Sequence, residues 1–102
     1  MGKVCMLAKV VAHDGKGDEL MAAFDSIFSQ VQQEPGTEVY VLNRSAQDPN
    51  VFFFYELYSD GDALAAHGGS DAMKAAAPLF GPLIKESEMI VGAPVKAEGL
   101  SI

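Results

Sequence analysis

Residues 50–70 read NVFFFYELYSDGDALAAHGGS and join an apolar strand, a polar break and a short helix. Alternate side chains of a strand point to opposite faces. One face then carries Val51, Phe53, Tyr55 and Leu57, and the other carries Phe52, Phe54, Glu56 and Tyr58. A strand with one wet face alternates apolar and polar residues, and this one barely does. We therefore expect both faces to be covered, with Glu56 enclosed in the strand and His67 a few residues beyond it.

Composition narrows the class of protein. The chain has 102 residues, is 49% hydrophobic and carries a net charge of -7. This length suits one domain, residues 1–102, with a core at about 3–92 and a tail at 93–102. The acidity argues against a nucleic-acid partner, which needs clustered Lys and Arg.

Cysteine content and the N-terminal sequence bear on location. Cys5 is the one cysteine, so no intrachain disulfide can form. The apolar run at 4–8 is interrupted by Lys9 and is too short for a signal peptide or a membrane span. We expect a cytoplasmic protein without a membrane partner.

The remaining elements follow from periodicity and turn residues. Strands are expected at 3–11, 38–45, 51–58 and 86–91, one amphipathic helix at 18–33, and a second helical region from about 60 to 80. Pro35-Gly36 ends the first helix, and the turn at 47–50 makes a hairpin of the second and third strands. Ser59 or Asp60 caps the second region, Gly68-Gly69 breaks it, Ser70 or Asp71 caps its second segment, and Pro78 kinks or ends that segment.

The order β-α-β-β-α-β predicts an α+β, ferredoxin-like fold, with helices on one face of a four-stranded antiparallel sheet. The second face would then expose residues such as Phe52, Phe54, Leu42 and Ile90, or their neighbours one position along. An apolar patch of this kind marks an interaction surface. A second copy of the chain is the expected cover, because two-fold homodimers are the commonest oligomers. Each sheet would then hold a cavity, with Glu56, Asn43, Tyr58 or Tyr40 as its polar groups.

Residues 34–78 carry the pattern of a known family. The pattern comprises Glu34-Pro35-Gly36, Asp48-Pro49-Asn50, Tyr55-Glu56-x-Tyr58, Ala63, His67 and Ser70. In order and spacing it resembles the antibiotic biosynthesis monooxygenase family. The resemblance implies a dimeric α/β barrel whose oxygenase members oxidise quinol-like or anthrone-like aromatics with O2 and no cofactor. Other members bind haem or isomerise small metabolites.

One branch of that family degrades haem, and this sequence departs from it. That branch uses a histidine late in the second helical region, an asparagine in the first strand and a tryptophan in the helix. Here residues 71–80 contain no histidine, the first strand has no asparagine, and the chain has no tryptophan. These departures argue against haem degradation.

Oxygenation without a cofactor needs a base, a group that holds an oxyanion and an apolar pocket. Glu56 or His67 could be the base, and Asn43, Tyr58 or Tyr40 could hold the oxyanion. Phe52 and Phe54 could bind substrate, or could simply pack the core. A metal site is not expected, because the two histidines lack ligand spacing.

Structural roles for the two candidate bases stay open. Glu56 could pair with Arg44 or with a backbone amide, and His67 could be a buried, satisfied histidine or could bond to Glu56. The leading hypothesis is a homodimeric, cofactor-independent monooxygenase acting on a quinol- or anthrone-like substrate. The alternatives are a non-catalytic dimer that binds haem or a small apolar metabolite, and an isomerase-like or structural member of the fold.

Overall fold

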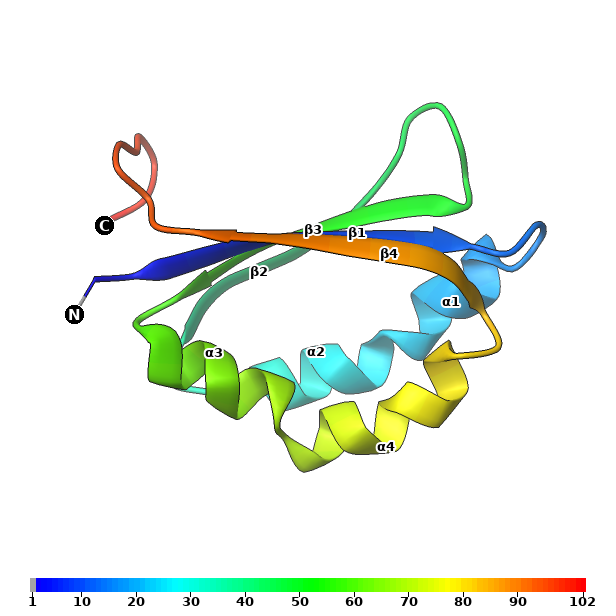
Figure 1. Cartoon of the computed structure of the whole chain (residues 1–102), viewed down its shortest axis with the longest axis horizontal. Coiled ribbons are helices and arrows are strands. Elements are labelled where there is room, and N and C mark those ends of the chain that lie inside the picture. The colour runs from blue at the N-terminus through cyan, green and yellow to red at the C-terminus, as the bar shows by residue number, and fades with distance from the viewer. Residues whose placement is uncertain (1) are drawn as a thin grey trace.

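The computed structural model describes residues 2–102 and confirms the α+β, ferredoxin-like fold (Figure 1). Its elements are β1 Val4–Ala12, α1 Gly17–Ala23, α2 Asp25–Val31, β2 Thr37–Arg44, β3 Val51–Tyr58, α3 Gly61–Gly68, α4 Asp71–Phe80 and β4 Ile84–Gly92. Among these residues, no helix is long and apolar enough to cross a membrane.

The four strands form one antiparallel sheet in the order β2-β3-β1-β4. The expected hairpin joins β2 to β3, and its turn is closed by the bond from the Val51 amide to the Asp48 carbonyl at 3.1 Å. β3 and β1 are central, while β2 and β4 are edges. The strand that carries Glu56 is therefore flanked on both sides.

All four helices lie on one side of the sheet (Figure 1). Under them, the aromatic ring of Phe24 packs edge-on against Phe54, with ring centroids 4.9 Å apart, and lies 5.0 Å from the ring of Phe80. Ala8, Val10 and Phe52 complete this buried cluster from the sheet. The covered face of β3 thus carries the main core.

The first helical region is two helices rather than the single helix expected at 18–33. The break falls at Phe24, whose amide is shared between the Leu20 and Met21 carbonyls at 3.3 Å each. Its carbonyl in turn accepts from both Ile27 and Phe28. This local tightening towards i→i+3 bonding places the Phe24 ring in the core. The apolar stripe nevertheless continues across the break.

The second helical region is divided as its capping residues predict. The Asp60 side chain accepts from the Ala63 amide at 2.8 Å and caps α3, and Ser70 accepts from Met73 at 3.2 Å and caps α4. α4 continues through Pro78 to Phe80, so the proline does not end the helix. Pro78 lacks the amide that would bond to the Lys74 carbonyl, but the helix continues beyond it, and the Gly81 amide still bonds to the Ala77 carbonyl at 3.1 Å.

The second face of the sheet has no helix over it, and we call it the open face. It exposes Leu7 (48%), Val41 (44%), Phe53 (43%) and Ile90 (63%). Of the two alternatives left open for this face, the register places Phe52, Phe54 and Leu42 under the helices and leaves Ile90 exposed. Their neighbours one position along face outward instead, and the segment after β4 lies on this side (Figure 1). The sheet is therefore apolar on both sides.

Candidate active site

β3 supplies two polar side chains to the covered face. Glu56 and Tyr58 are two residues apart, so both point towards the helices, while Leu57 between them points to the open face. Glu56 is 2% exposed and Tyr58 is 0% exposed. The Tyr58 hydroxyl donates a hydrogen bond to Oε1 of Glu56. A carboxyl group is thus buried with one defined donor.

His67 is brought to the same place by the last turn of α3. Its ring lies between two tyrosine rings, with centroids 5.2 Å from Tyr40 and 5.6 Å from Tyr58. Tyr40 on β2 is the register partner of Glu56. The two candidate bases, Glu56 and His67, and two of the candidate polar groups, Tyr40 and Tyr58, therefore lie close together, whereas the third candidate, Asn43, is not among them.

The alternative partners expected for these residues are not the ones found. Nδ1 of His67 lies 2.9 Å from Oε1 of Glu34, rather than bonding to Glu56. Arg44 does not pair with Glu56 but with Asp18, at 2.8 Å from Nη2 to Oδ1. Glu56 is thus held by a tyrosine and not by a cation.

Glu34 is the site residue that sequence reasoning missed. It lies between α2 and β2 and accepts from the Thr37 hydroxyl at 2.7 Å and from the Gln30 amide at 3.1 Å. In the sequence, Pro35-Gly36 predicts the end of a helix, and Glu34-Pro35-Gly36 belongs to the pattern shared with the family. Nothing in its spacing indicated contact with a histidine 33 residues later.

A cavity of about 350 Å³ adjoins these groups, between the sheet and the helices. Glu56, His67, Tyr40 and Ser87 are its polar members. The remaining walls are largely apolar and include Met6, Ala8, Val10, Phe24, Ile27, Phe54, Leu64, Met73, Phe80, Ile84 and Met89. Met89 is on the edge strand β4 and is 65% exposed, so the cavity opens to solvent there.

This position corrects one expectation about the site. The polar groups were expected in a cavity between the sheets of two subunits, whereas they lie within one chain, under its own helices. Asn43 is on the opposite face, where its amide donates to the Phe53 carbonyl at 3.2 Å, so it cannot serve this cavity. Phe52 is 0% exposed in the core, below the Arg44 guanidinium, while Phe54 lines the cavity.

Burial shifts the pKa values of three side chains at the site, Glu56, Tyr58 and Tyr40. It raises the pKa of Glu56 above its ordinary value, although the Tyr58 hydrogen bond and His67 oppose this. Burial, together with the nearby carboxylates, also raises the pKa of Tyr58 and of Tyr40, so both phenols stay protonated at neutral pH. A carboxyl group with a raised pKa is suited to exchanging protons with a bound molecule. The phenols can act as hydrogen-bond donors.

Among residues 2–102, no group of three or more His, Cys, Asp or Glu side chains is placed to hold a metal ion. The chemistry that the described side chains themselves offer is proton transfer and hydrogen bonding in an apolar enclosure.

Comparisons with known proteins agree with this arrangement. The family model described as antibiotic biosynthesis monooxygenase matches residues 3–79. A structure from Caulobacter crescentus, provisionally described as an antibiotic biosynthesis monooxygenase, is 32% identical with a TM-score of 0.86, covering 93% of this chain and 92% of that one. A Shewanella oneidensis protein is 25% identical with a TM-score of 0.88, covering 94% of both chains. A Nitrosomonas europaea structure, similarly described, shares the fold at 20% identity and a TM-score of 0.87, covering 97% of both chains. No curated protein matches the chain.

Proposed function

Since the chain belongs to the antibiotic biosynthesis monooxygenase family, we propose that it oxidises a quinol- or anthrone-like aromatic molecule with O2. The observation that carries this proposal is the buried carboxyl group of Glu56 beside an apolar cavity. A cavity of about 350 Å³ is at the lower end of the range for small-molecule pockets. It suits a flat aromatic molecule with one or two oxygen substituents.

The reaction needs no electrons from outside the substrate. A base removes a proton from an acidic C–H or O–H group, and the resulting anion gives one electron to O2. The radical pair combines to a peroxide on the substrate carbon. After protonation, the O–O bond breaks, and loss of the second hydrogen leaves a carbonyl group and one water molecule. One oxygen atom of O2 is then in the product and the other is in water.

The side chains divide these tasks. Glu56 takes the first proton, because its raised pKa brings it closer to the pH at which it works. Tyr58 donates to Glu56 and stabilises the carboxylate before the proton is taken. Tyr40 offers a protonated phenol to the oxyanion of the substrate. His67 is the second proton carrier at the pocket wall.

Oxygen uptake tests this proposal. The purified protein, incubated with a panel of anthrones and hydroquinones, is expected to consume O2 faster than buffer does. Glu56→Gln keeps the shape of the side chain and should lower kcat by about 10²- to 10⁴-fold, the usual range for a general base. The control is Glu19→Gln, which removes an exposed carboxylate of α1 that pairs with Lys16. Absence of uptake with every compound would overturn the proposal, and binding without uptake would favour a ligand-binding protein instead.

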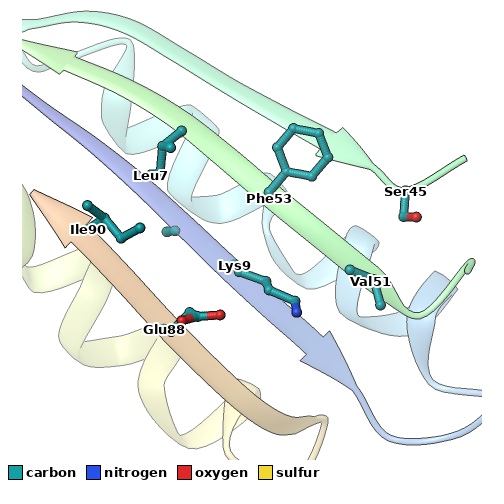
Figure 2. A pocket seen from close by; sticks show the side chains of 8 residues that line it. Leu7, Lys9, Ser45, Val51, Phe53, Glu88 and Ile90 are labelled. Atoms are coloured by element: carbon teal, nitrogen blue, oxygen red, sulfur yellow. The ribbon is translucent and has the colours of Figure 1, made fainter. Parts of the chain in front are cut away.

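We also propose that the open face is covered by a second copy of this chain. Figure 2 shows the side chains of Leu7, Phe53 and Ile90 standing on the side of the sheet away from the helices. Lys9 and Glu88 lie among them and are paired in the register, so one positive and one negative group sit within an apolar surface. Such a surface is complementary to its own two-fold copy, in which opposite charges can face each other.

A further inference from the structure

We propose that Glu34 is a positioning residue that fixes His67 in the tautomer with the proton on Nδ1. The other ring nitrogen, Nε2, then carries no proton, and it can accept one from a molecule bound in the cavity. The catalytic use of Nε2 rests on the proposed function, whereas the tautomer itself does not.

The contact is enclosed. The Nδ1 and Oε1 atoms are 2.9 Å apart, and the side chains of His67 and Glu34 are 4% and 11% exposed. Gly36 permits this approach, because a Cβ at that position would lie 2.5 Å from the Cβ of Ala63 on α3. The segment that carries Glu34 is therefore packed directly against the helix that carries His67.

The other partners of Glu34 determine which group donates. A threonine hydroxyl and a glutamine amide both reach its carboxylate, at 2.7 Å and 3.1 Å, and the amide nitrogen can only donate. Burial by itself raises the pKa of Glu34, but the bonds from Thr37, His67 and Gln30 lower it below its usual value. Glu34 is thus an ionised acceptor, and the imidazole must give it the Nδ1 proton.

The remaining groups around the ring do not compete for Nδ1. Tyr40 of β2 and Tyr58 of β3 face the imidazole with their rings, and the Tyr58 hydroxyl is bonded to Glu56. Glu56, on the same strand as Tyr58, is the second carboxyl group near the ring, and His67 acts to lower its pKa against the effect of burial. Glu34 is therefore the carboxylate that contacts a ring nitrogen of His67. Such an orienting carboxylate sets which ring nitrogen is available.

Nitrogen-15 NMR of histidine-labelled protein reads the tautomer directly and needs no substrate. At a pH where imidazoles are neutral, we expect His67 to show the Nδ1–H tautomer, the less common form in free histidine. His13, exposed in a turn, is an internal reference for the common Nε2–H form. His67→Gln assigns the two sets of signals. An Nε2–H tautomer at His67 in the wild-type protein would overturn the proposal.

Two variants separate positioning from packing. Glu34→Ala removes the acceptor and should convert His67 to the Nε2–H form, whereas the control Glu38→Gln, whose partner is Lys3, should not. Glu34→Gln keeps an acceptor oxygen without the charge, so the tautomer should persist while kcat falls about tenfold or more. Persistence of the Nδ1–H form in folded Glu34→Ala would contradict the assignment. If the tautomer is as expected but no compound gives O2 uptake, the positioning role stands and the proposed reaction falls.

Discussion

The two faces of β3 are both apolar, yet they differ in exposure and in what they hold. On the covered face Phe52, Phe54, Glu56 and Tyr58 are at most 4% exposed, whereas on the open face Phe53 is 43% exposed. The covered face encloses a carboxyl group, a cavity and the core, and the open face presents a surface without helices. The difference teaches that a strand with two apolar faces can serve two separate tasks, which we propose are chemistry on one side and association on the other.

The largest expected effect comes from truncating an aromatic ring on each face. Phe54→Ala should lower the free energy of unfolding by about 3–5 kcal/mol, because the ring is buried against Phe24 and Tyr40. Phe53→Ala should cost less in the single chain, because the residue is 43% exposed there, and its cost should rise when the two-fold partner is bound. Urea unfolding at several protein concentrations distinguishes the two variants. Equal, concentration-independent losses would contradict the division between the faces.

A charge on the open face should separate the subunits. Leu7→Lys or Phe53→Lys places an ammonium group in the proposed interface, with an expected cost of about 2 kcal/mol or more in association. This corresponds to a dimer dissociation constant raised about 30-fold or more. Leu79→Lys on α4 is the matched control, since Leu79 is 60% exposed on the helical side. Sedimentation should show dimers for the wild type and for Leu79→Lys, and monomers for the two open-face variants. A wild-type protein that is monomeric at micromolar concentration would refute the dimer.

The folded-state stabilities contributed by Glu56 and Glu34 should depend on pH with opposite signs. The folded pKa of Glu56 is raised by burial, so its stabilising contribution is present below the unfolded pKa and is lost as pH rises through the folded value. Glu56→Gln should therefore be more stable than the wild type at neutral pH, with the difference vanishing in acid. The pKa of Glu34 is lowered, so its contribution is present above the unfolded pKa and is lost as pH falls through the folded value.

Glu34→Gln should accordingly be less stable at neutral pH, by about 1.5–3 kcal/mol, the range for hydrogen bonds to a charged group. Its deficit should shrink as the pH falls. Thermal melts of the wild type and both variants from pH 3 to 8 measure the two differences. Curves that run parallel over this range would show that neither carboxyl group has the environment described.

The fold was predictable from the sequence because local signals agreed with one another. The bounds of β3, the cap at Asp60 and the cap at Ser70 follow from turn and capping residues and match the structure. The division of the first helix at Phe24 did not follow, since the apolar stripe runs through the break. Periodicity reports which side of a helix is buried, not whether its backbone bonds are continuous.

The site was only partly predictable. Glu56, Asn43, Tyr58 and Tyr40 were the candidate polar groups of a cavity, and the structure places Glu56, Tyr58 and Tyr40 near His67 but Asn43 on the other face. The catalytic and binding roles of these residues remain predictions. Because β3 is apolar on both sides, its sequence does not predict which face of the sheet the helices cover. Asn43 was therefore named as a cavity residue although it lies on the open face. The contact of Glu34 with His67 spans 33 residues and depends on the packing of α3, which no local pattern reveals.

Methionine methyl NMR locates the substrate site and tests the central claim that the chemistry belongs to the covered face. Met6, Met73 and Met89 line the cavity, whereas Met21 is 41% exposed on α1 outside it. Titration with an anthrone in the absence of O2 should shift the methyl signals of the three cavity methionines and leave Met21 unchanged. No shift at any of the three, or a shift confined to Met21, would contradict the account.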